Sequence, residues 1–406
     1  MLTSEWALYL TFACSIGALG WGALQYHLVS KVEMSSGNIK VQTLTDEEKR
    51  EITAREQEGL GVTQPPQTQE ACLTEMLRIA DKISTGANEF LRKEYTYLVG
   101  FCLLFSAVIY AFVDYPVSPL PSTTLAFWVG ALTSMLCGFI GMRIAVYTNV
   151  RTTLSCCSSL YEGFHVAFKG GQVLGFCLVG LAVLVLQVLI LAYRALLIKE
   201  AAQSEEEFTN QVRELFEAVA GYGLGGSLVA LFGRVGGGIY TKAADVGADL
   251  AGKVCEGLEE DSPENPGTIA DNVGDNVGDI AGMGADLFGS LAESTCAALV
   301  VSAHSQDLLT TSDAVYFPLI VTAIGIFASF LSQFCARLSI EASFLLLPCA
   351  EQFFLALLCE ALAVLGLGLT LPLLLRLAAK VLLTAHGDAH QRFLEKLEIH
   401  VLARRI

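Results

Sequence analysis

The sequence predicts an all-α, polytopic membrane protein with about eight transmembrane helices, and two observations carry this prediction. First, the 406 residues are 53% hydrophobic and only 16% charged, with a mean hydropathy of +0.54. A soluble domain of this size needs far more charge on its surface. Second, the chain repeatedly contains apolar runs that approach the roughly 20 residues needed to cross a bilayer.

Six of these runs are apolar throughout, and two more contain ionisable residues. The uninterrupted runs are residues 6–26, 98–113, 125–144, 173–197, 315–336 and 353–375, and the interrupted ones are residues 216–238 and 280–302. The first run lacks a basic leading segment and a small-residue cleavage site, so we interpret it as a retained span and not as a signal peptide.

The distribution of charge excludes one class of partner and predicts an orientation. The net charge of −16 argues against binding to nucleic acid, whose phosphates require a basic face. With the N-terminus lumenal or outside, the inner loops are residues 29–93, 145–170 and 253–268. Lys and Arg are concentrated there, whereas the outer loops contain almost none, as the positive-inside rule requires.

Two predicted helices, residues 216–256 and 266–304, carry an unusual pattern of ionisable residues. At about 100° per residue, each helix collects its charges on one stripe. The first stripe contains Arg234, Lys242, Asp245, Asp249 and Lys253, and the second contains Asp271, Asp275, Asp279, Asp286 and Glu293. Charges at membrane depth are costly and usually face a cavity in which they bind or move something.

The cytoplasmic part of this pattern predicts a site for Mg²⁺ and a polyphosphate. Several carboxylates in a low-dielectric place cannot all stay ionised without cations, and Mg²⁺ typically joins a few carboxylates to substrate phosphates. Lys242 and Lys253 supply point charges for phosphate oxygens. The alternative is a structural network of ion pairs confined to residues 242–253, which leaves Asp271, Asp275 and Asp279 without partners.

The remaining charges are predicted to lie deeper in the membrane. At about 1.5 Å per residue, Asp286 lies roughly 22 Å and Glu293 roughly 33 Å along the helix from Asp271, and Arg234 lies roughly 16 Å from Asp245. A buried arginine beside buried acids suits an ion relay, in which one carboxylate changes protonation as a neighbouring charge moves. The alternative is a static ion pair that holds two helices together.

Residues 221–226 match the pattern G-x-G-x-x-G. No strand is predicted before them, so close helix packing through small residues explains them better than a dinucleotide site.

The strings that follow are long and specific. They are residues 233–238, Lys242 to Lys253, Asn265-Pro266, residues 269–279 with the sequence Ile-Ala-Asp-Asn-Val-Gly-Asp-Asn-Val-Gly-Asp, and residues 285–288. In these strings the chain resembles the membrane-bound, ion-pumping inorganic pyrophosphatases of the vacuolar-type H⁺-pyrophosphatase family. Weaker similarity covers residues 83–97 and 138–153, so the resemblance spans roughly residues 6–302 and extends to about residue 336.

This resemblance implies a role for each matching residue. Lys242 and Lys253 would contact pyrophosphate, and Asp245, Asp249, Asp271 and Asp275 would bind Mg²⁺. Asp279 would orient the attacking water as a general base. Arg234, Asp286 and Glu293 would couple hydrolysis to ion movement, and Gly289 with Glu293 resembles the proton pumps more than the sodium pumps.

The resemblance also implies partners and reveals departures. Family members form homodimers and have about 16 spans, and their site closes with acids and lysines from the second half. We therefore divide the chain into residues 1–336, a family-like half, and residues 337–406, a divergent span and charged tail. Cys255 and Ser262 stand where the family has acids.

The expected function is pyrophosphate-driven proton translocation by an incomplete chain, in an acidic-compartment or vacuolar-type membrane. The alternatives are an inactive membrane protein that retains the half-site and associates with a full-length copy, and a carboxylate-lined cation channel. Dependence on K⁺ stays open, because the deciding positions lie in the second half.

Overall fold

The computed structural model describes residues 6–32, 34, 68–115, 121–198, 205–256, 265–305 and 314–343. Within these ranges every regular element is a helix. The chain divides into two compact units, residues 1–326 and residues 327–406. The first unit contains all the predicted site residues and is described below. In the second unit, the described residues are the end of the last helix.

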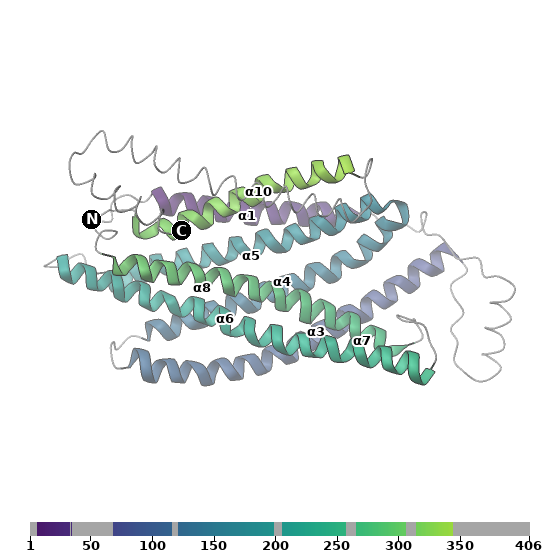
Figure 1. Ribbon diagram of the computed structural model, residues 1–406, viewed down its shortest axis with the longest axis horizontal. Coiled ribbons are helices and arrows are strands. Elements are labelled where there is room, and N and C mark those ends of the chain that lie inside the picture. Colours follow the sequence, from purple (N-terminus) through teal and green to yellow (C-terminus); the bar gives the residue numbers. More distant parts are fainter. Residues whose placement is uncertain are drawn as a thin grey trace, which may run out of the picture. The chain divides into compact units, whose positions relative to one another are not determined.

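Six helical stretches are long and apolar enough to cross a membrane, which confirms the predicted all-α membrane fold. Figure 1 shows their long helices, which are α1 (Trp6–Ser30), α3 (Gln69–Ile109), α4 (Ser122–Ser158), α5 (Leu160–Leu197), α6 (Glu205–Leu250) and α8 (Gly282–His304). The helix α10 (Phe317–Ser343) adds a shorter apolar stretch, Phe317–Leu331. The predicted span at residues 353–375 lies outside the described residues.

The sixth stretch is built from three consecutive pieces. It begins with α7 (Pro266–Gly274), continues as the π-helical turn η3 (Asp275–Ala281) and ends with α8. Asn265 caps its start, because the side-chain oxygen accepts a hydrogen bond from the backbone N–H of Gly267 at 2.9 Å. The amide group of Asn265 also donates to the carbonyl of Ala248 at 2.7 Å, which ties this start to the end of α6.

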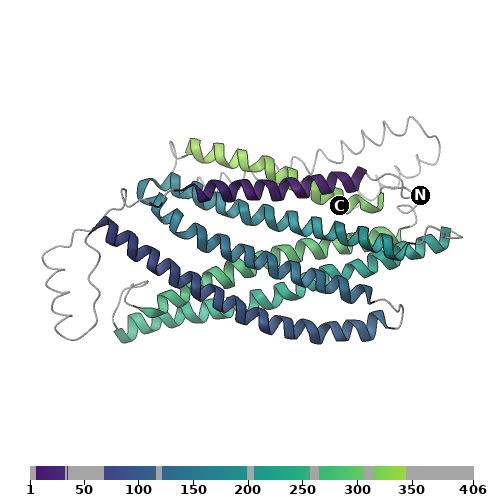
Figure 2. The same cartoon turned by 180° about the vertical axis from the view of Figure 1, so that it is seen from behind.

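The helices alternate in direction, so connections that are distant in sequence meet at one end of the first unit. Figures 1 and 2 show the end of α1, the start of α3, the α4–α5 connection, the end of α6 and the start of α7 at this end. These are the segments predicted to be cytoplasmic. Which side of a membrane they face stays a prediction.

Glycines let α4 and α6 approach each other closely. Gly221 and Gly225 of α6 lie against the backbone carbonyls of Thr123 and Phe127, where a Cβ atom would collide. Gly130 of α4 lies equally close to the carbonyl of Tyr222. The predicted packing through small residues in this segment is therefore confirmed.

The same device joins α6 to η3 and α8. A Cβ at Gly237 would lie 2.6 Å from the Cα of Gly278, and one at Gly289 would lie 3.0 Å from the Cα of Ser227. Between these helices Phe288 is fully buried, and its ring packs against Tyr222 with the ring centroids 5.7 Å apart. The two charged helices are thus held side by side along most of their length.

Candidate functional site

At the start of the second charged helix the sequence Asp-Asn-Val-Gly is repeated, and the side chains at its four positions lie on different faces of the helix. The valines Val273 and Val277 are buried in a cluster with side chains of α3 and α4. Gly274 and Gly278 lie against α6, where a Cβ at Gly274 would stand 2.9 Å from the Cα of Thr241. The carboxylates Asp275 and Asp279 are left exposed. A four-residue repeat on a helix therefore separates packing from chemistry.

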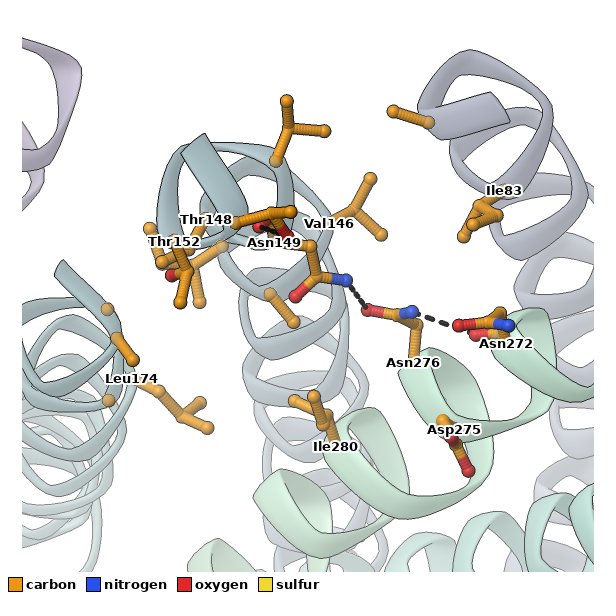
Figure 3. Close-up of a pocket in the computed structure, with 18 of the residues that line it drawn as sticks. Ile83, Val146, Thr148, Asn149, Thr152, Leu174, Asn272, Asp275, Asn276 and Ile280 are labelled. Carbon is orange, nitrogen blue, oxygen red and sulfur yellow. Dashed lines mark hydrogen bonds between the residues drawn. The ribbon is translucent and has the colours of Figure 1, made fainter. Parts of the chain in front are cut away.

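The asparagines of the repeat fix this helix against α4, as Figure 3 shows. Asn149 of α4 donates a hydrogen bond from Nδ2 to Oδ1 of Asn276 at 3.1 Å. Asn276 in turn donates to the carbonyl of Asn272 at 2.8 Å. Asn276 is 4% exposed, so its amide needs these partners. The link sits beside a cavity of about 780 Å³ that Asp275 also lines.

The carboxylate stripe differs from the regular α-helix that we predicted. Asp275 and Asp279 belong to the π-helical turn η3, and Lys253 belongs to a second such turn, η2 (Ala251–Glu256). A π-helical turn inserts extra residues per turn, so the constant 100° spacing is wrong between residues 275 and 281. Such turns frequently mark functional sites in helices.

At the end predicted to be cytoplasmic, lysine–aspartate pairs form within α6 and η2. Lys242 Nζ lies 3.3 Å from Asp245 Oδ2, and Lys253 Nζ lies 3.4 Å from Asp249 Oδ2. Coulomb attraction also acts on Lys242 from Asp279 and Asp275 across the helix pair. The predicted charges of the two helices therefore face a common region, and two of the ion pairs there join residues of one chain segment.

The donor chemistry of this region fits Mg²⁺ in company with phosphates. Its acids, Asp245, Asp249, Asp271 and Asp275, offer only oxygen ligands, which hard divalent ions prefer. Among the described residues, no three acidic, histidine or cysteine side chains converge closely enough to hold a metal by themselves. Mg²⁺ usually takes one or two carboxylates and completes its shell with substrate phosphates and water, so this spacing suits a shared site.

A second group of polar residues lies deeper along the same helix pair. Arg234 Nε of α6 lies 3.8 Å from Asp286 Oδ2 of α8, with both side chains about half exposed. One level further, the hydroxyl of Ser227 donates a short hydrogen bond to Glu293. The structure therefore brings the predicted arginine and acid together, and it adds Ser227, which the sequence analysis missed because serines are common on helix surfaces.

Glu94 of α3 is another acid that the sequence analysis missed. Its Oε1 atom is shielded from solvent and has no hydrogen-bond partner. This oxygen would lie 3.8 Å from a Cβ at Gly233 and 3.9 Å from one at Gly236. It therefore lies against two glycines of α6, one before and one after Arg234 in the sequence. A single acid such as Glu94 does not indicate a functional site in the sequence, because the residues that surround it in space are not known at that point.

One flank of α6 is uncovered in the first unit. Lys242 is exposed there, together with the large apolar side chains of Val235, Ile239 and Val246. Apolar exposure suits lipid, but an exposed lysine or aspartate near membrane depth does not.

The described residues form an all-α bundle with six helices long and apolar enough to cross a membrane, which is the class of polytopic membrane proteins. The chain matches the family described as inorganic H⁺ pyrophosphatase over residues 18–385 and belongs to it. This match continues beyond residue 336, where the resemblance was expected to weaken.

Several curated relatives are similar to the chain over most of its length. A putative K⁺-stimulated pyrophosphate-energized sodium pump of Bacteroides thetaiotaomicron is 41% identical over 65% of the chain and 36% of its own length. A K⁺-insensitive pyrophosphate-energized proton pump of Caldanaerobacter subterraneus is 36% identical over 77% of the chain and 42% of its own length.

A plant relative, pyrophosphate-energized membrane proton pump 3 of Arabidopsis thaliana, is 38% identical over 63% of the chain and 33% of its own length. The chain thus spans between a third and about two fifths of the length of these relatives.

Proposed function

We propose that this chain carries the first half of a pyrophosphate-driven proton pump. Pyrophosphate would bind at the cytoplasmic ends of α6 and α7–η3, and protons would pass the deeper group. The observation that supports this most is that both groups lie on one closely packed helix pair. A change at the substrate end can then be transmitted along the helices to the ion path.

Each residue of the cytoplasmic end has a chemical role in this proposal. Lys242 and Lys253 attract phosphate oxygens and exchange their aspartate partners for substrate. Asp245, Asp249, Asp271 and Asp275 would hold Mg²⁺, which supplies charge neutralisation of the phosphates when bound. Asp279 would accept a proton from the attacking water, because a carboxylate within hydrogen-bond reach of that water can act as a general base.

In the deeper group, a proton is proposed to move between acids whose partners change. Asp286 and Arg234 face each other across α6 and α8, so a movement of the guanidinium would change the charge beside this acid. Glu293, which accepts a hydrogen bond from the Ser227 hydroxyl, is the second acid proposed on the proton path. A Cβ at Gly289 would lie 3.0 Å from the Cα of Ser227, so the packing disfavours an acid at this position, one turn before Glu293. Glycine at 289 with glutamate at 293 is the pattern that resembles the proton pumps, so this packing supports protons over sodium as the transported ion.

A second candidate function follows from the uncovered flank of α6. The chain would then be a non-catalytic membrane protein that retains the Mg²⁺–pyrophosphate half-site and associates with a full-length copy. Cys255 and Ser262, in place of two acids, also favour it. A homodimer and an acidic or vacuolar-type membrane with the N-terminus lumenal are further proposals, and dependence on K⁺ stays open.

Two preparations separate these functions. The chain alone in proteoliposomes should release phosphate slowly or not at all and should not acidify the lumen, because the described residues offer the phosphates charged groups from α6–η2 and α7–η3 alone. A hybrid joins residues 18–305 to the remaining part of the Caldanaerobacter proton pump. This hybrid should hydrolyse pyrophosphate with Mg²⁺ and acidify the lumen.

Robust acidification by the chain alone would show that the half-pump proposal is wrong. A folded hybrid without hydrolysis would favour the non-catalytic function. Sodium-dependent transport without acidification by the hybrid would overturn the choice of proton.

A further inference from the structure

A pocket outside the site described above combines apolar walls with two arginines. It has a volume of about 540 Å³ and lies between α1, α3, α4 and α5. Large apolar side chains on its rim are exposed, among them Tyr26, Leu77 and Phe139. An apolar recess that stays open beside cations is unusual for a surface that faces only water.

Arg151 of α4 is the buried cation of this pocket. It is only 9% exposed, and its guanidinium carbon lies 3.6 Å from the centroid of the Tyr147 ring. Its Nη1 donates to the carbonyl of Tyr147 at 2.8 Å, but its Nε is shielded from solvent and has no acceptor. Burying a guanidinium N–H without an acceptor costs free energy, and Arg151 therefore has one donor whose hydrogen bond is not made within the protein.

Arg143 supplies a second cation two turns away on the same helix and is exposed in the pocket. No described residue forms an ion pair or side-chain hydrogen bond with it. Asp81 of α3 is an acid on the pocket wall, so the three charges sum to +1, two positive and one negative. The pocket therefore favours an anion.

The order of side chains along α4 indicates what kind of anion. Phe139 and Ile140 come first and lie within the predicted span at residues 125–144. Arg143 follows at its end, and Tyr147 and Arg151 lie beyond it, toward the predicted cytoplasmic side. Apolar groups deeper than basic ones match a lipid with its acyl chains inward and its headgroup at the interface.

We infer that this pocket binds one anionic phospholipid of the inner leaflet. The lipid phosphate lies between Arg143 and Arg151, and an acyl chain covers Phe139 and Ile140. Asp81 and Ser84 face the headgroup from α3 and accept hydrogen bonds from its hydroxyl or amine groups. Free inorganic phosphate shares the charge chemistry, but it leaves the apolar half of the pocket unfilled.

Native mass spectrometry of the purified chain tests this inference without any activity measurement. The probes are phosphatidylglycerol and phosphatidylcholine with identical acyl chains, each titrated with and without millimolar inorganic phosphate. We expect one retained phosphatidylglycerol and no comparable retention of phosphatidylcholine. Arg143→Gln should weaken phosphatidylglycerol about five-fold, the effect of removing one interfacial cation. Phosphate should not displace the lipid.

Arg92→Gln is the matched control, because Arg92 of α3 is exposed and does not line the pocket. It removes the same charge and should leave lipid retention unchanged. Circular dichroism checks that the variants keep their helices. Equal affinity for the two lipids, equal losses in Arg92→Gln and Arg143→Gln, or displacement by free phosphate would each overturn the inference.

Discussion

The two groups of charges on α6 and its partner helix are stabilised in different ways. In the deeper group, the contacts cross between helices, from Arg234 to Asp286 and from Ser227 to Glu293. At the cytoplasmic end, the lysine–aspartate pairs join residues three or four positions apart in the same segment. Contacts of the first kind tie two helices together, whereas those of the second kind do not.

This difference indicates which group of charges can bind a ligand and which can transmit a movement between the two helices. The pairs within one segment can open without moving a helix, so a phosphate can replace the aspartate on each lysine. The contacts between helices link side chains of α6 to side chains of α8, so a shift of one helix along the other would change them. The two π-helical turns of the charged helices, η2 and η3, lie at the ligand end.

Asp279→Asn should have the largest effect and should act on the ligand end alone. In the hybrid pump, hydrolysis should fall by about a hundred-fold or more, because an amide cannot accept a proton from water. Binding of Mg²⁺ with a non-hydrolysable pyrophosphate analogue should persist. Phosphate release and calorimetric titration measure the two properties. Hydrolysis that survives within a factor of a few would show that Asp279 has another role.

Gly225→Ala tests the helix packing that carries both groups. The new Cβ would fall on the carbonyl of Phe127 and 2.9 Å from the amide nitrogen of Ala131, which belong to the backbone of α4. Overpacking of this kind destabilises by about 1–3 kcal/mol, so the midpoint of thermal unfolding should fall.

Gly238→Ala, on the same helix, is the control, because no atom lies within 4 Å of its added Cβ. Alanine favours the helix more than glycine does, so this variant should be as stable as the parent or more so. Equal losses in both variants would mean that the α4–α6 contact is not the cause.

Ser227→Ala and Lys242→Gln sharpen the comparison between the two groups. Loss of the hydroxyl removes a contact between helices and should lower stability by about 1 kcal/mol. Loss of the exposed lysine removes a contact within one segment and should leave the unfolding midpoint unchanged within error. The measurement is thermal unfolding in detergent. A larger loss in Lys242→Gln than in Ser227→Ala would reverse our assignment.

The sequence was sufficient to predict the helices, the placement of Arg234 near an acid of the second charged helix and the packing role of residues 221–226. Each of these features follows from composition or from regular spacing along one helix, so it can be recognised without knowing which helices are neighbours. The boundaries 266–304 agree with α7–η3–α8, and the end of 216–256 agrees with η2, but α6 begins earlier than predicted, at Glu205. The interruption between them is marked by Asn265 and Pro266, which are recognisable start signals.

Other features depend on neighbours that spacing does not reveal. The π-helical turn at Asp275 lies where Gly274 and Gly278 come into close contact with the backbone of α6. The bond of Asn149 to Asn276 joins residues far apart in the chain, and a serine such as Ser227 becomes informative only beside Glu293. The burial of Glu94 likewise depends on glycines of another helix.

Binding of Mg²⁺ together with a non-hydrolysable pyrophosphate analogue tests the central claim most directly. The purified chain is titrated with each ligand alone and with both, and thermal unfolding is followed at millimolar concentrations. We predict a rise in the unfolding midpoint only when both are present, because each supplies charge that the other needs. Lys242→Gln should weaken the rise. No rise with both ligands would contradict the claim that these helices carry a pyrophosphate half-site.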